Sequence, residues 1–110
     1  MNPLTPRIKM PSQASVGDVI EIKTKVRHPM ETGWRKDGNG NAVPRNRINW
    51  FVCSFEGNEV FSASFHSGIS ADPYLVFHNR VAGAGTYTFE WHADDNSVLV
   101  ASVPIEIINT

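Results

Sequence analysis

Apolar and polar residues alternate along most of the chain in short runs, which is the pattern of strands with one buried and one solvated face. The clearest run is Asp18–Arg27, where β-branched residues such as Ile20 and Ile22 alternate with charged ones. Gly, Pro, Asn and Asp fall between the runs, as is typical of turns. The pattern predicts strands with the approximate bounds Arg7–Met10, Asp18–Arg27, Ile48–Phe55, Glu59–Phe65, Tyr74–Val81, Thr86–His92 and Val98–Ile108.

The number and spacing of these runs indicate the fold class. Seven short strands with little helical periodicity are typical of an all-β, immunoglobulin-like two-sheet β-sandwich; a small β-barrel is the alternative. The length of 110 residues fits one domain over 1–110, and no repeat or boundary divides it. Pro104 predicts a sheet edge or a bulge in the last strand, because proline has no N–H to donate.

The run Ile48–Phe55 differs from the others because both of its faces are largely apolar. Alternation predicts one face made of Ile48, Trp50 and Val52, and an opposite face that includes Cys53. Such a strand is covered on both sides, so one face belongs to the core and the other needs a loop or a partner protein. We interpret Cys53 as a buried core side chain, since a reactive thiol needs a more cationic and open setting.

A long irregular segment, His28–Arg47, separates the second and third predicted strands. Asp-Gly and Asn-Gly dipeptides at its centre predict the tip of a hairpin near Gly38–Gly40. A loop this long in a small domain is either functional or disordered, and its apolar residues favour a functional one. Its arginines suit forked contacts with anionic oxygens. The residues selected here for partner or anion contact are Met30, Trp34, Arg35, Lys36, Arg45 and Arg47.

Composition excludes several classes of protein. A net charge of −1 argues against nucleic acid as the main partner, and no apolar run is long enough to span a membrane. One cysteine allows no internal disulfide. Residues 1–50 hold nine basic and four acidic side chains, whereas residues 51–110 hold one basic and seven acidic. This asymmetry can steer a partner, although we expect much of it to cancel where the two halves interleave.

The histidines and Cys53 raise the question of a metal site. The histidines are His28, His66, His78 and His92. Four histidines and one cysteine resemble the ligand set of the iron centre in superoxide reductase, an immunoglobulin-like domain. That family has a Cys-x-x-His motif, whereas Cys53 is followed by Ser54, Phe55 and Glu56. No motif for nucleophilic catalysis or phosphate binding occurs. We expect no enzyme, catalytic residue, metal or cofactor, and keep a mononuclear iron superoxide reductase-like domain as the alternative.

A set of segments forms a joint pattern from about Arg7 to Ile107. They are His28–Gly33, Arg35–Asp37, Pro44–Asn46, Ile48–Asn49, Phe51–Phe55, Val60–Ala63, Ile69–Tyr74, Gly85–Tyr87, Phe89–Trp91 and Asp94–Asp95. This joint pattern resembles the SoxZ family, although each segment alone is weak evidence for it. Trp34 and Trp50 stand where the family leads us to expect other residues. The resemblance implies a non-catalytic, immunoglobulin-like subunit of the SoxYZ sulfur-carrier complex of bacterial thiosulfate and sulfide oxidation.

The resemblance also implies a partner and a compartment. SoxY would bind this chain as a heterodimer and carry the sulfur intermediates on the cysteine of its C-terminal arm, while other Sox enzymes would make transient contacts. The complex would be periplasmic, and export together with SoxY would reconcile this location with an N-terminus that shows no apolar signal segment. Alone, the chain is expected to form a homodimer or a higher oligomer. The expected partner-binding residues are Trp50, Val52, Met30, Trp34, Arg35, Arg45 and Arg47.

Overall fold

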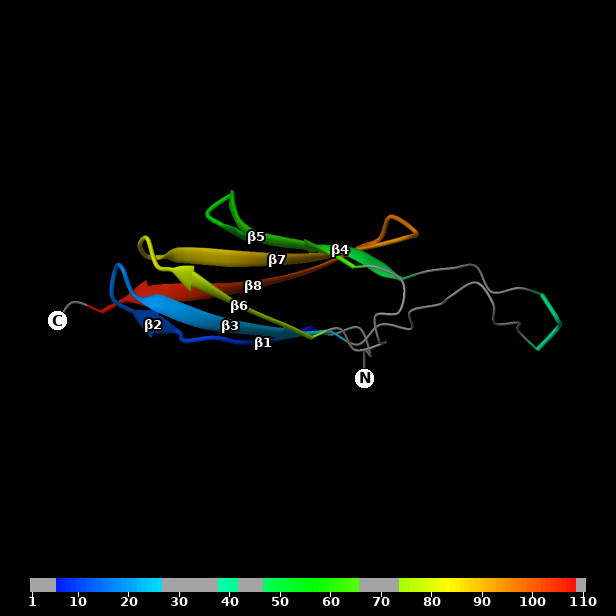
Figure 1. Cartoon of the computed structure of the whole chain (residues 1–110), viewed down its shortest axis with the longest axis horizontal. Helices are drawn as coiled ribbons and strands as arrows, with labels where there is room; N and C mark the ends of the chain where they lie inside the picture. The colour runs from blue at the N-terminus through cyan, green and yellow to red at the C-terminus, as the bar shows by residue number, and fades with distance from the viewer. Residues whose placement is uncertain (1–5, 27–37, 42–46, 66–73, 109–110) are drawn as a thin grey trace.

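The structure, a computed structural model, describes residues 6–26, 38–41, 47–65 and 74–108 (Figure 1). In these ranges the chain forms two facing sheets of strands (Figure 1). The strands are β1 (Arg7–Lys9), β2 (Gln13–Ala14), β3 (Val19–Lys25), β4 (Ile48–Phe55), β5 (Asn58–Ser64), β6 (Tyr74–Arg80), β7 (Gly85–Ala93) and β8 (Val98–Ile107). One sheet has the order β1-β3-β6 and the other the order β2-β8-β7-β4-β5. The predicted all-β, two-sheet sandwich is confirmed.

The predicted strands are present, and their ends differ from the prediction by at most one residue where the structure describes those ends. The exception is β2, which alternation could not reveal because it has only two residues; it pairs in parallel with Glu106 and Ile107 of β8. The N–H of Glu106 donates to the carbonyl of Ser12, and the N–H of Ile108 donates to the carbonyl of Ala14. Pro104 precedes this contact, so it lies where that edge of β8 is still open, as predicted. In the described ranges, no helix is long and apolar enough to cross a membrane.

Alternation decides which side chains fill the space between the sheets. In β7 the residues Tyr87, Phe89 and Trp91 are at most 1% exposed, whereas the residues between them are half-buried on the outer face. In β3 the buried residues are Ile20, Ile22 and Thr24. Burying side chains of this size stabilises the fold by about 1.5–3 kcal/mol each. The core therefore lies between β3 and β6 on one side and β4, β7 and β8 on the other.

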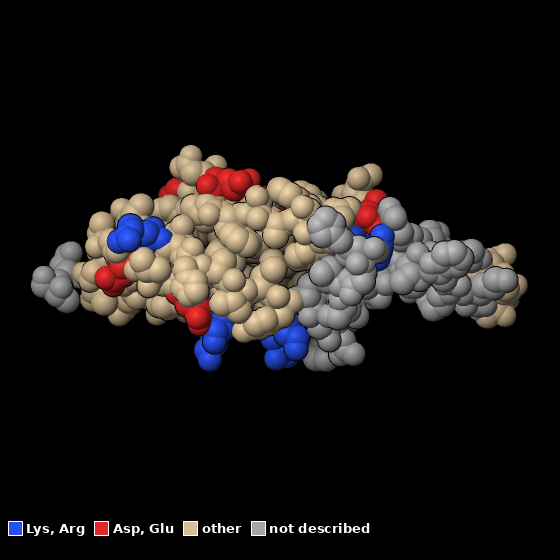
Figure 2. All heavy atoms as spheres, in the orientation of Figure 1, with Lys and Arg blue, Asp and Glu red and all other residues tan. Residues whose placement is uncertain are grey.

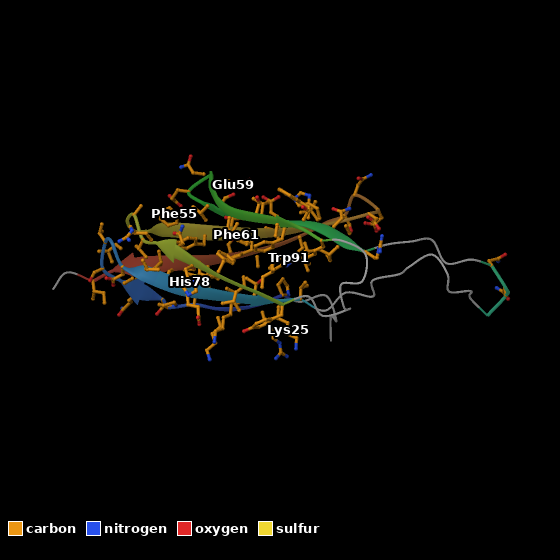
Figure 3. The ribbon with its side chains drawn as sticks, viewed as in Figure 1. Lys25, Phe55, Glu59, Phe61, His78 and Trp91 are labelled. Carbon is orange, nitrogen blue, oxygen red and sulfur yellow. The ribbon has the colours of Figure 1, made fainter. Side chains whose placement is uncertain are left out.

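Aromatic rings connect the two sheets across this core. The ring centroid of Phe51 lies 5.2 Å from that of Trp91 in the same sheet and 6.0 Å from that of Phe77 in the opposite sheet. The rings of Phe61 and Phe77 stack with centroids 4.3 Å apart, where the edge strands β5 and β6 meet. Trp91 and Phe61 lie between the layers in Figure 3. Phe51 thus occupies the centre of the contact between the sheets.

One prediction about β4 is wrong, and a bulge explains it. Ile48 pairs with Ala93, whereas Trp50 pairs with His92, so Asn49 is an extra residue on this strand. An extra residue in one strand reverses the side to which the following side chains point. Ile48 is therefore buried in the core at 3% exposure, on the face opposite Trp50. Trp50 and Val52 remain on the outer face, as alternation predicted for these two.

Candidate protein-binding site

The outer face of the five-stranded sheet carries exposed apolar side chains on β4 and β8, with β7 between them. The strand register aligns them in rows, because opposed residues of antiparallel strands point to the same side. The first row is Trp50, His92 and Val98, and the second is Val52, Glu90 and Val100. We call these six residues the β4–β8 face. Segments far apart in the sequence thus supply one continuous surface.

The β4–β8 face is more apolar than a solvated strand surface needs to be. Val100 is 55% exposed, Val98 44% and Trp50 37%. Single exposed apolar residues are common, but a contiguous group on a flat sheet marks a surface for contact with another protein. Trp is also the type of residue that most often anchors protein interfaces. Two of the residues selected from the sequence, Trp50 and Val52, lie on this surface.

A close contact between a histidine and a carboxylate occupies the middle strand of the β4–β8 face. Nε2 of His92 lies 3.3 Å from Oε1 of Glu90, and both side chains are about one-third exposed. Each sits between two apolar neighbours of its row. A partner that covers the face would remove this pair from water, which adds specificity for a complementary surface more than it adds affinity.

Sequence reasoning missed the two residues of β8 on this face, Val98 and Val100. A signal was available, since Val98–Val103 is apolar on both of its faces apart from Ser102, as Ile48–Phe55 largely is. The interpretation that one face of a doubly apolar strand needs a cover applies equally to β8. What the sequence did not show is that β8 lies only one strand away from β4.

Arg47, another residue selected from the sequence, has a partner inside the domain. Its backbone N–H donates to Oδ2 of Asp94 over 3.1 Å, and its Nε lies 3.8 Å from the same oxygen. The backbone N–H of Asp94 donates in return to the carbonyl of Arg47 over 2.9 Å. Asp94 also accepts a hydrogen bond from the side chain of Asn49. Arg47 thereby fixes the start of β4 against the turn between β7 and β8.

The other selected residues, Met30, Trp34, Arg35, Lys36 and Arg45, lie outside the described ranges. The predicted hairpin tip near Gly38–Gly40 lies within the described ranges. Residues 38–40 form a turn in which Gly40 has a φ of 85°, and this turn is exposed. It lies well away from the sheets, beyond the end of the sandwich opposite the C-terminus (Figure 1). The predicted turn near Gly38–Gly40 is therefore present.

The possible metal ligands in the described ranges point in three directions. His78 faces outward from the three-stranded sheet, His92 faces outward from the five-stranded sheet, and Cys53 points into the core. These three side chains cannot share one metal ion, and no group of three potential ligands occurs among the residues described. His28 and His66 lie outside those ranges. Burial raises the pKa of the Cys53 thiol from 9.0 to about 12, which favours the unreactive protonated form.

Fold and surface together define an immunoglobulin-like β-sandwich with an apolar face suited to protein contact. The family model of the sulphur oxidation protein SoxZ matches residues 8–104, and the chain belongs to the SoxZ family. It is therefore a subunit of the carrier complex of the Sox sulfur-oxidation system, and this family consists of non-catalytic carrier subunits. No curated protein sequence matches the chain significantly.

Solved structures support the immunoglobulin-like fold. The sulfur carrier protein SoxY from Chlorobium limicola f thiosulfatophilum is 12% identical with a TM-score of 0.67, and the match covers 94% of this chain and 79% of SoxY. A superoxide reductase (neelaredoxin) from Ignicoccus hospitalis is 18% identical with a TM-score of 0.73, and the match covers 94% of this chain and 80% of that one. At these identities the likeness shows the fold alone, so the second match carries no argument for an iron centre.

Proposed function

We propose that this chain is the non-catalytic half of a SoxY-containing heterodimer, in which SoxY carries the sulfur intermediates on its C-terminal cysteine arm. The chain acts as a scaffold that holds SoxY and offers docking surface to the Sox enzymes that visit the carrier. The observation that carries the proposal is the exposed β4–β8 face in a member of the SoxZ family. A surface of this kind is stable in a complex, where a partner removes it from water.

The likeness in fold between this chain and SoxY supports sheet-to-sheet contact. Two sandwiches can pack outer face against outer face, because sheets stack at a separation of about 10 Å with their side chains interleaved. Trp50, Val98 and Val100 would then form the apolar centre of the interface. A second copy of the chain could use the same face when SoxY is absent, which is why we expect the isolated protein to form a homodimer.

Three further parts of the proposal rest on the family. The heterodimer works in the periplasm, and this chain is exported there together with SoxY. The residues Met30, Trp34, Arg35, Arg45 and Arg47 belong to a segment offered to SoxY or to a visiting enzyme, where the arginines would contact the anionic sulfur adduct. No cofactor takes part, since the sulfur is carried on a cysteine of SoxY. Cys53 is not a carrier group, because it is fully buried.

The test of the proposed interface compares two valines of equal exposure. Val100 on the β4–β8 face is 55% exposed and Val19 on the opposite sheet is 56% exposed. Val100→Glu is expected to weaken binding to SoxY at least about tenfold, because it places a carboxylate in the apolar centre of the contact. Val19→Glu adds the same charge outside the contact and is expected to leave binding within about twofold. The measurement is the dissociation constant of each variant with SoxY from the same genome.

Several outcomes decide the proposal. The wild-type chain, co-expressed with the neighbouring reading frame, must first recover a stoichiometric partner that ends in a cysteine-bearing arm. Equal losses in the Val100 and Val19 variants would remove the β4–β8 face as the interface. Thermal unfolding of both variants at the wild-type temperature would show that a loss of binding is not a loss of fold. Absence of any such partner, with iron bound at one per chain, would favour the superoxide reductase-like alternative.

A further inference from the structure

A second surface lies on the opposite side of the sandwich, and it is cationic. On the outer face of the three-stranded sheet Arg7 lies opposite Lys25, and Lys9 lies opposite Lys23. We call these four residues the cationic ladder. Lys and Arg side chains project from the lower border of the molecule in Figure 2, next to an acidic one, and further acidic side chains lie along its upper border. Lys25 and Glu59 accordingly extend from opposite sides in Figure 3. This face of the three-stranded sheet therefore carries an excess of positive charge in the described part of the fold, whereas Arg47 is paired with Asp94 elsewhere.

The ladder is costly for the fold. Like charges directly opposite one another on neighbouring strands are destabilising. Glu21 is the carboxylate that faces the ladder from β3: its Oε1 lies 3.3 Å from Nζ of Lys23, and its Oε2 lies 3.5 Å from Nε2 of His78 on β6. Arg80 lies at the other end of β6, where its guanidinium donates to the carbonyl of Gly17. Among the described residues, four cations thus face one carboxylate, Glu21, which is also in contact with His78. Folding alone does not favour this arrangement.

Neighbouring residues indicate what kind of partner fits this surface. The register continues each pair of the ladder onto β6, with Tyr74 beside Lys25 and Val76 beside Lys23. Tyr74 is 55% exposed and Val76 is 44% exposed. The surface therefore combines cations with an aromatic and an apolar contact on a flat sheet. Arginine and tyrosine are enriched in protein interfaces, and a flat row of charges matches an acidic protein surface better than a small anion, which needs converging donors.

We infer that the cationic ladder, with Tyr74 and Val76, docks the acidic surface of an enzyme that loads or unloads the sulfur carrier. This inference rests on the proposed function. The ladder faces away from the β4–β8 face, since the two belong to the outer sides of different sheets. SoxY and a visiting enzyme can therefore occupy the chain at the same time. Attraction between the ladder and an acidic patch accelerates encounter and orients the enzyme, and salt weakens it.

The experiment uses the heterodimer of this chain and SoxY as the substrate. Its concentration is varied in assays of each purified carrier-processing enzyme from the same genome. The test variant is Lys9→Gln/Lys25→Gln, which removes one cation from each strand of the ladder. The matched control is Asn58→Asp/Asn96→Asp, which lowers the net charge equally at exposed hairpin positions away from the ladder. For at least one enzyme we expect kcat/KM of the test variant to fall about tenfold at low salt, and the deficit to close at about 0.5 M salt. The control is expected to stay within about twofold.

The outcomes separate the inference from the proposed function. Unchanged rates with every enzyme, or equal falls in test variant and control, would overturn the ladder as a docking surface while the heterodimer remains intact. Failure to form the heterodimer would overturn both. Binding to vesicles of anionic phosphatidylglycerol and to an oligonucleotide is measured as well. If the wild-type heterodimer binds either of them and the test variant does not, the ladder is assigned to a lipid or nucleic acid instead. The melting temperature of the test variant should equal or exceed that of the wild type, because it loses like-charge repulsion.

Discussion

Replacing Phe51 by alanine is expected to lower the free energy of unfolding by about 3–5 kcal/mol. Phe51 is 0% exposed and its ring lies within 6.3 Å, centroid to centroid, of those of Phe61, Phe77, Phe89 and Trp91. The change removes a ring from a core that cannot collapse around the space, since those neighbours belong to two different sheets. Because the total stability of a domain is about 5–15 kcal/mol, a large share of it would be lost.

The measurement is chemical denaturation followed by the fluorescence of the tryptophans, with two further variants as a series. Phe51→Leu keeps most of the volume and is expected to cost about 1–1.5 kcal/mol. Phe61→Ala empties a half-buried position at the open edge of the sandwich and is expected to cost less than Phe51→Ala. If Phe61→Ala destabilised the protein as much as Phe51→Ala or more, Phe51 would not be the centre of the contact between the sheets.

Cys53 is expected to react with thiol reagents about a thousandfold more slowly in the folded protein than in the unfolded chain at pH 8. The thiolate is the reactive species, and raising the pKa from 9.0 to about 12 lowers its population by about this factor. The side chain is also 0% exposed, which blocks the approach of the reagent. Labelling with iodoacetamide in buffer and in denaturant, followed by mass spectrometry, measures the ratio.

The same pKa predicts the direction of an alkaline effect on stability. Burial favours the protonated thiol in the folded state, so its contribution is fully present below the unfolded pKa of 9.0 and is lost as the pH rises toward about 12. Tyr87 acts in the same direction, because burial and the nearby Cys53 raise the pKa of its phenol. Cys53→Ala should flatten the fall in stability above pH 9.

Rapid labelling of Cys53 in buffer, at the rate of the unfolded chain, would contradict the buried position of the thiol.

Much of the fold could be predicted from local patterns. The alternation in Val19–Lys25 and Gly85–Ala93 has the period of a strand, so the buried residues of β3 and β7 follow from the sequence alone. Asp and Asn residues in the turn before β8 predict the reversal there, and Asn96 indeed has a φ of 68°. The prediction that Cys53 is a core residue also rested on its immediate neighbours, and its 0% exposure confirms it.

The sites are harder to predict, because each of them depends on residues that are distant in the sequence. The β4–β8 face joins Trp50 and Val52 to Val98 and Val100, and this juxtaposition requires β7 to lie between β4 and β8. The cationic ladder requires β1 to pair with β3 in the register that puts Lys9 opposite Lys23. Hydrogen bonding between strands decides such registers, and a shift of one residue would turn every side chain to the other face.

The sequence by itself determined that this protein is an all-β sandwich in which Ile48–Phe55 is largely apolar on both faces, because strand periodicity and turn residues are local properties. Its joint pattern of segments pointed to the SoxZ family, to which the chain belongs. Only the tertiary structure decided that Ile48 turns into the core, since the bulge at Asn49 is a mismatch between paired strands. Only the tertiary structure separated the apolar surface from the cationic one, because the order and register of non-local strands place them on opposite sheets.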